Sequence, residues 1–123
     1  MKENQKVERT FQKVCEKYDI ENRAFTKEDF YRICESENIT AKEMDSPTSF
    51  YLRVKSKLFI VVEEKLEREK KIFAMMHELG HHFLEHRGRK MQNAFYFDSR
   101  DKENEAEADG FALLATGLKQ EAR

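Results

Sequence analysis

The 123-residue sequence has no tryptophan, one proline and four glycines, and it lacks any long apolar run. No stretch approaches the roughly 18 consecutive apolar residues of a membrane span, so no membrane association is expected. The polar N-terminus, residues 1–11, lacks the apolar region of a signal peptide. Without an export signal, Cys15 and Cys34 are expected to be reduced thiols rather than a disulfide. The sequence therefore predicts a cytoplasmic protein.

An excess of charge of either sign is also absent. The chain carries 23 lysines and arginines against 24 aspartates and glutamates. This balance offers no basic surface to nucleic acid or to an anionic membrane, so direct nucleic-acid binding is not expected. No repeat, low-complexity tract or linker divides the sequence, and its length suits one domain. We therefore treat residues 1–123 as a single domain, whose small core draws on ten phenylalanines and four tyrosines.

Hydrophobic periodicity predicts two helices in the first third of the chain and a hairpin after them. Apolar residues at helical spacing predict a first helix over residues 4–18. Thr26 is the predicted N-cap of a second helix that runs to about residue 37. Asp29 is well placed to complete a capping box by accepting a hydrogen bond from the Thr26 backbone. Alternation over residues 50–54 and the β-branched run 58–62 predict two antiparallel strands, the second covered on both faces.

The last third of the sequence is predominantly helical in pattern. One helix is predicted over about residues 66–87, with Gly88 as its stop, and residues 89–98 are predicted to form a loop. A final helix, capped by Ser99 or Asp101, is predicted to end near residue 116, before Gly117. Helices, a short antiparallel sheet and two further helices make an α+β domain.

The most informative stretch is His77-Glu78-Leu79-Gly80-His81. Residues four apart share one face of a helix, so the two imidazoles can converge on a single metal ion. Glu78 borders that face without sharing the ion, which suits the general base of a metallopeptidase. A surface helix rich in histidine and glutamate would show the same letters, so the interpretation requires a third ligand.

The segment Glu105-Ala106-Glu107-Ala108-Asp109 supplies a candidate third ligand. On a helix, Glu105, Ala108 and Asp109 share one side, whereas Glu107 lies nearly opposite. Glu105 is the predicted ligand, and Asp109 is predicted to accept a hydrogen bond from a ligand ring, most simply that of His77. A solvated acidic helix start would give a similar pattern. The apolar continuation over residues 111–114 favours a packed helix.

Two neighbouring features bear on this interpretation. Gly80 costs about 1 kcal/mol relative to alanine inside a helix, so we expect another element to pack closely against it. Residues 82–86 spell the inverted His-x-x-Glu-His motif of a second metallopeptidase group. His82 and His86 point about 140° away from the face of the first pair, so they cannot share its ion. They are expected to be exposed or half-buried.

Residues 72–114 resemble the ImmA/IrrE family of zinc metallopeptidases. The matching text is FAMMHELGHHFL at residues 73–84 and EAEADGFA at residues 105–112. The resemblance implies a small zincin-like fold and one Zn²⁺ per chain, bound by His77, His81 and Glu105, with Glu78 catalytic. It also implies an origin in a bacterium, phage or mobile element, and cleavage of a helix-turn-helix transcriptional repressor.

The match is not uniform. The Glu-x-x-x-Asp arrangement is shared with other gluzincin-type peptidases, so that wider group stays open. Family members often continue with Leu-Leu-Met-Pro, whereas this chain has Leu-Leu-Ala-Thr-Gly at residues 113–117. The chain ends soon afterwards, at Arg123, so any C-terminal substrate-binding portion is expected to be missing or minimal.

The predicted reaction is hydrolysis of a peptide bond in a protein substrate that lies extended against a sheet edge beside the metal helix. Strand 50–54 is the candidate edge. Tyr96, Tyr51 and His82 are candidates for stabilising the oxyanion or contacting the substrate. Two other functions stay open. One is a metal-containing regulatory module that sequesters a repressor without cleaving it, and the other is a metal-free interaction domain. The sequence specifies neither the substrate nor the oligomeric state.

Overall fold

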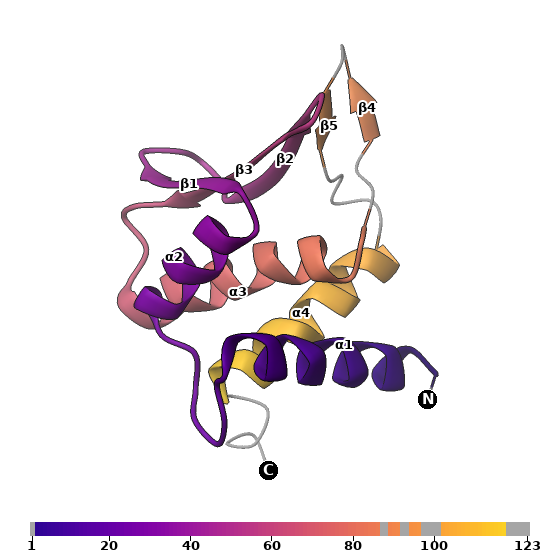
Figure 1. Cartoon of the computed structure of the whole chain (residues 1–123). Helices are drawn as coiled ribbons and strands as arrows, with labels where there is room; N and C mark the ends of the chain where they lie inside the picture. Colours follow the sequence, from indigo (N-terminus) through magenta and orange to yellow (C-terminus); the bar gives the residue numbers. More distant parts are fainter. Residues whose placement is uncertain (1, 87–88, 92–93, 97–101, 118–123) are drawn as a thin grey trace.

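Four helices lie on one side of a five-stranded sheet in the computed structural model, which describes residues 2–86, 89–91, 94–96 and 102–117 (Figure 1). The helices are α1 (Lys2–Tyr18), α2 (Lys27–Ser36), α3 (Arg68–Phe83) and α4 (Lys102–Thr116). The strands are β1 (Ile39–Met44), β2 (Phe50–Val54), β3 (Lys57–Glu63), β4 (Arg89–Met91) and β5 (Ala94–Tyr96). This arrangement confirms the predicted α+β class.

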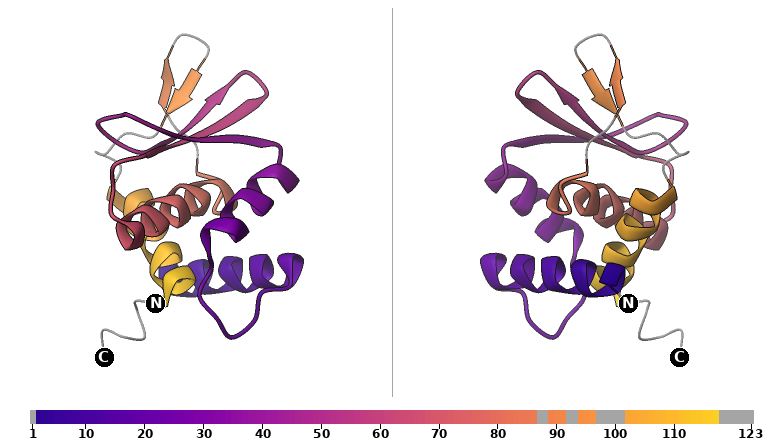
Figure 2. Two further views of the ribbon diagram at one scale, coloured as in Figure 1. Left: turned by 90° about the vertical axis from the view of Figure 1, so that its left-hand side faces the viewer. Right: turned by 90° about the vertical axis from the view of Figure 1, so that its right-hand side faces the viewer.

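The sheet has the strand order β1-β3-β2-β5-β4, in which only β1 and β3 run parallel among the described strands. The predicted hairpin is present as β2 and β3, with Val54 paired to Lys57. The prediction that β3 is covered on both faces was wrong. Ile60 and Val62 are fully buried, but Phe59 and Val61 on the opposite face are only half-buried. The reason is that all the described helices lie on one side of the sheet (Figure 2).

Three strands were not predicted from the sequence. Residues 89–98 were expected to be a loop, but β4 and β5 form a hairpin there, and β5 pairs with Leu52–Val54 of β2. Consequently β2 is an inner strand over those residues, and the expectation that a substrate lies along it as an edge strand is not met there. β1 was missed because its inward positions include a charged residue, Glu43, which weakens the apolar alternation.

The helices follow the sequence pattern closely. Thr26 accepts a hydrogen bond from the Asp29 N–H at 3.1 Å, and the Asp29 carboxylate accepts one from the Thr26 N–H at 2.8 Å. The predicted capping box is therefore confirmed. α4 ends at Thr116 before Gly117, which has φ +78°, as predicted. The two residues proposed as its cap, Ser99 and Asp101, lie outside the described residues.

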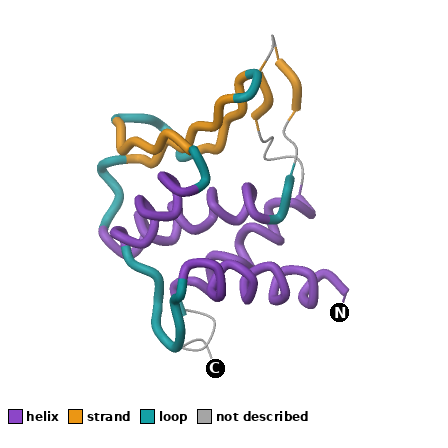
Figure 3. Tube along the Cα trace, viewed as in Figure 1, coloured by secondary structure: helices purple, strands orange, loops and turns teal. Residues whose placement is uncertain are grey.

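The core lies between the sheet and the two layers of helices. α2 and α3 lie next to the sheet, while α1 and α4 lie farther from it (Figures 1 and 3). The largest fully buried apolar side chains are Ile20 before α2, Phe30 and Ile33 of α2, Ile60 of β3, Met75, Met76 and Leu79 of α3, and Phe111 of α4. α3 is therefore enclosed by the sheet on one side and by helices on the other.

None of the helices in the described residues combines the length and the apolar character that a bilayer span requires.

Candidate metal centre

The two histidines of the metal-binding motif project from the C-terminal half of α3. Met75, Met76 and Leu79 are completely buried and fix the rotation of the helix about its axis. His77 and His81, four residues apart, consequently point the same way, and their ring centroids are 4.8 Å apart. The His81 side chain is 1% exposed and that of His77 is 15% exposed. The pair therefore borders the buried face of α3, and solvent reaches the His77 ring but hardly the His81 ring.

α4 crosses α3 closely enough to bring a carboxylate to this pair. The close approach is possible because Gly80 has no side chain: a Cβ built there would lie 3.3 Å from the Cα of Ala108. The sequence expectation that another element packs against Gly80 is therefore met, and that element is the helix that carries Glu105. Small residues at both contact points let the two backbones approach each other.

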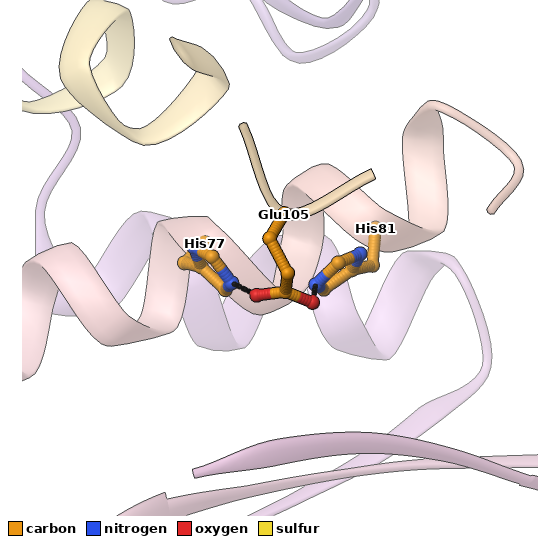
Figure 4. Close-up of side chains that lie close together, drawn as sticks. All are labelled: His77, His81 and Glu105. Atoms are coloured by element: carbon orange, nitrogen blue, oxygen red, sulfur yellow. Dashed lines mark hydrogen bonds and ion pairs between the residues drawn. The ribbon is translucent and has the colours of Figure 1, made fainter. Parts of the chain in front are cut away.

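The carboxylate of Glu105 lies between the two imidazoles (Figure 4). Its Oε1 is 2.9 Å from His77 Nε2, and its Oε2 is 3.1 Å from His81 Nε2. One ligand atom from each of the three residues lies within 4.8 Å of the other two. In the part of the chain that the structure describes, this is the only such group of potential ligands. The three residues singled out from the sequence are thus brought together from two helices.

The remaining nitrogen of His77 faces a second carboxylate. His77 Nδ1 is 2.8 Å from Asp109 Oδ1, as the sequence predicted. A carboxylate can only accept a hydrogen bond, so Nδ1 carries the proton. In a neutral ring, Nε2 then presents a lone pair toward Glu105, which is also an acceptor. Such a contact requires a cation between the two atoms, either a proton or a metal ion. The donor set therefore fits a metal.

The electrostatics of the cluster agree with this reading. Burial favours the neutral form of His77, but the hydrogen bond to Glu105 and the charges of Glu78, Glu105 and Asp109 outweigh it and raise the pKa of the ring. Burial likewise favours neutral Glu105, yet hydrogen bonds from His77 and His81 lower its pKa to about 2. The carboxylates of Glu105 and Asp109 lie next to the imidazoles, so the site attracts positive charge.

Glu78 lies beside the cluster and is buried. Burial, with the negative charge of Glu105, raises the pKa of this carboxyl to about 8, although His77 opposes the shift. A cation bound to the neighbouring ligands would lower the pKa again, because it favours the carboxylate. Glu78 is therefore a buried carboxyl group whose protonation depends on the charge at the neighbouring ligands, which suits general acid–base catalysis.

His86 was expected from the sequence to be exposed or half-buried, but it is buried. α3 was predicted to continue to residue 87 but ends at Phe83. Glu85 then adopts a left-handed conformation with φ +59°. The His86 N–H bonds to the His81 carbonyl at 3.0 Å, and the Glu85 N–H to the His82 carbonyl at 3.1 Å. These two bonds define a Schellman motif, which returns the chain over the last helical turn.

This turn of the chain brings the His86 ring into contact with the His81 ring. His86 Nδ1 lies 2.8 Å from His81 Nδ1, and His86 Nε2 lies 2.7 Å from Glu107 Oε1. Glu107 is buried on α4, where its Oε1 also meets Lys6 of α1 at 3.3 Å. An uninterrupted helix through residue 86 would have turned His86 away, which explains why the helical projection misplaced it.

Two of the three candidate oxyanion or substrate residues contact each other. The Tyr51 hydroxyl is 2.9 Å from His82 Nδ1, and His82 Nε2 is 2.9 Å from Glu37 Oε1. Tyr51 is buried, and burial raises its pKa to about 12. The backbone of the third candidate, Tyr96, pairs with Leu52 of β2, and its side chain lies outside the described residues. The inverted motif does not form a second cluster, since His82 and His86 bond to different glutamates.

The family model Peptidase_M78, described as an IrrE N-terminal-like domain, matches residues 32–115. The matched region begins within α2 and includes the sheet, α3 and nearly all of α4, with every residue of the cluster. No curated protein and no solved structure matches the chain.

Proposed function

Because the chain belongs to the family of the IrrE N-terminal-like domain, a peptidase family, we propose that it is a zinc-dependent endopeptidase. His77, His81 and Glu105 bind one zinc ion, and Glu78 is the general base. The observation that carries the proposal is the Glu105 carboxylate, held 2.9 and 3.1 Å from the Nε2 atoms of the two histidines, with Glu78 buried beside them.

Each residue of the site has a separate task. Two imidazoles and a carboxylate are a typical ligand set of catalytic zinc, which leaves a position for water or substrate. Asp109 holds the proton of His77 on Nδ1 and so keeps its Nε2 available to the metal. A bound zinc ion supplies Lewis-acid chemistry, which makes water a stronger acid and a carbonyl a better electrophile. Glu78 takes a proton from the attacking water and returns it to the leaving amine.

We propose a helix-turn-helix transcriptional repressor of a phage or mobile element as the substrate. This part of the proposal is supported by the resemblance of residues 73–84 and 105–112 to the ImmA/IrrE family. Tyr51, His82 and Tyr96 are the proposed contacts to the substrate or its oxyanion. A tyrosine hydroxyl or an imidazole can donate a hydrogen bond to an oxyanion, as the transition state of peptide hydrolysis requires.

The test compares the wild type with Glu78→Gln and His77→Ala. Metal content is measured by mass spectrometry, and cleavage is followed on a purified repressor encoded beside the gene. We expect about one zinc per chain in the wild type and in Glu78→Gln. Because general acid–base catalysis contributes about 100-fold or more, Glu78→Gln should cut at least about 100-fold more slowly. His77→Ala should lose both zinc and cleavage.

Other outcomes identify the alternatives. If Glu78→Gln still releases the repressor from its operator as the wild type does, while His77→Ala does not, the chain is a metal-dependent binding module. If the wild type contains no stoichiometric zinc, the chain is instead a metal-free interaction domain.

A further inference from the structure

A chain of four side chains leads from His81 to the surface of α1. His81 Nδ1 is 2.8 Å from His86 Nδ1, His86 Nε2 is 2.7 Å from Glu107 Oε1, and the same oxygen is 3.3 Å from Lys6 Nζ. His81, His86 and Glu107 are buried. The proposed catalytic steps use neither His86 nor Glu107. Buried polar groups are costly unless they are hydrogen-bonded, so the arrangement of protons along this chain is tightly constrained.

The contact between the two Nδ1 atoms holds one proton. If His81 presents its Nε2 lone pair to a metal ion, its remaining proton is on Nδ1, and His81 is the donor. His86 Nδ1 must then be the acceptor, so the neutral ring of His86 carries its proton on Nε2. That proton points to Glu107, which can only accept it. One arrangement of protons therefore satisfies the contact of His81 with His86 and the contact of His86 with Glu107 when the metal is bound.

We propose that His86 is a positioning residue for His81: by accepting the Nδ1 proton, it holds the His81 ring in the orientation and tautomer that metal binding requires. The inference rests on the proposed function of His81 as a zinc ligand. Glu107 orients His86 in turn. The arrangement parallels that of His77 and Asp109, except that an imidazole is inserted between the ligand and its carboxylate.

The local fold explains why an imidazole occupies this place. His81 is buried, and its Nδ1 faces His86, whose other ring nitrogen reaches Glu107 of α4. The Schellman motif at the end of α3 brings the residue five positions later back over His81. An imidazole at that position accepts on one nitrogen and donates on the other, so it spans the distance to Glu107 without an unsatisfied group.

Zinc affinity tests the inference without any peptide substrate. Competition with a chromophoric chelator is measured for the wild type, His86→Phe, His86→Asn and His82→Phe. His86→Phe keeps the bulk but removes the acceptor, so its affinity should fall about 10–100-fold. His86→Asn retains an oxygen near the place of Nδ1 and should recover most of the loss. His82→Phe is the matched control, because it removes the adjacent imidazole and its glutamate contact, and it should bind zinc like the wild type. Equal affinity of His86→Phe and the wild type, or an equal loss in His82→Phe, would overturn the inference.

The tautomers are measured directly in the zinc-loaded wild type by two-bond proton–nitrogen NMR correlations. The expected pattern is Nδ1–H for His81 and Nε2–H for His86. A proton on Nδ1 of His86 would contradict the inference, and this result does not depend on the folding of any variant. A chain that shows the expected tautomers and affinities but cleaves nothing refutes the peptidase proposal alone. Unchanged zinc affinity of His86→Phe in an active peptidase refutes the positioning role alone, and a wild type that takes up no zinc refutes both.

Discussion

Gly80 of α3 lies so close to Phe111 of α4 that a Cβ atom added to Gly80 would be 3.0 Å from the Cβ of Phe111. This contact sets the distance between the helix that carries the two histidines and the helix that carries Glu105. The geometry of the cluster therefore depends on a position that contributes no ligand.

Substitution of Gly80 by alanine should weaken both the fold and the site. The added methyl group meets a Cβ and a backbone, neither of which can rotate away, and overpacking of this kind costs about 1–3 kcal/mol. The better helix propensity of alanine returns about 1 kcal/mol. We expect a net loss of up to about 2 kcal/mol in the free energy of unfolding, with weaker zinc binding, measured by urea denaturation and chelator competition.

Gly110→Ala is the matched control, because its Cβ would lie 3.5 Å from Val7 Cγ1, an ordinary contact. This variant should be stabilised by up to about 1 kcal/mol and should bind zinc normally. If Gly80→Ala and Gly110→Ala behaved alike, the close approach of the two helices would not limit the site.

Asp109→Asn should reduce zinc affinity about 10–100-fold with little change in stability. The carboxylate of Asp109 is 2.8 Å from His77 Nδ1, and an amide there can donate as well as accept, so it no longer fixes the proton on Nδ1. Chelator competition measures the effect. Glu103→Gln, which removes an exposed carboxylate from the first turn of the same helix, controls for the loss of one negative charge. Equal losses in both variants would reduce the role of Asp109 to general electrostatics.

Acidification should remove the contribution of Glu43, which joins β1 to α3. Its carboxylate meets Tyr31 at 2.6 Å, Lys71 at 2.9 Å and Lys27 at 3.0 Å. The hydrogen bond from Tyr31 lowers its pKa to about 2 from 4.5; burial opposes the shift, and the two lysines add to it. Since the unfolded chain binds this proton more tightly, the contribution is complete above about pH 4.5 and is lost as the pH falls through about 2.

Comparison of the wild type with Glu43→Gln isolates this contribution. At neutral pH the variant should be less stable by about 1–2 kcal/mol, less than the full pKa difference allows because solvent screens the half-exposed Lys27. The difference between the two proteins should shrink as unfolding is measured at pH values from about 5 down to about 2. A difference that stays constant over this range would show that packing, and not charge, is what Glu43 contributes.

Glu85→Gly should stabilise the protein by about 0.5–1 kcal/mol. Glu85 occupies the left-handed position of the Schellman motif with φ +59°, where a side chain is strained and glycine is not. Thermal unfolding gives the measurement. Asn38→Gly is the comparison, since Asn38 has φ +61° after α2 but asparagine tolerates this region better, and its gain should be smaller. A larger gain at Asn38 would contradict the steric explanation.

Much of the site could be predicted because it follows from the helical spacing of residues that are close in the sequence. The spacing of His77 and His81 places two imidazoles on one helical face, and the small residues after Glu105 indicate a helix that packs closely. Asp109 follows from the same helical projection. These inferences use only residues within one element each, together with the assumption that the two elements meet.

The rest depends on where elements end and on contacts between distant segments. His86 could not be placed, because its position follows from the early end of α3 at Phe83 and the left-handed Glu85. No local signal such as a glycine marks that end. β1 escaped prediction because Glu43 faces inward to meet residues of α2 and α3. The contact of Tyr51 with His82 likewise joins a strand to a helix 31 residues later.

The first helix has a consequence for how this protein can be shortened. α1 lies before the matched region 32–115, yet its Phe11 ring packs edge-on against Phe111 at 5.6 Å and its Lys6 contacts Glu107. A truncated protein starting at residue 32 would expose the far side of α4 to water and leave Glu107 without Lys6. The N-terminal helix therefore supports the helix that carries Glu105, and a fragment that keeps these contacts must begin well before residue 32.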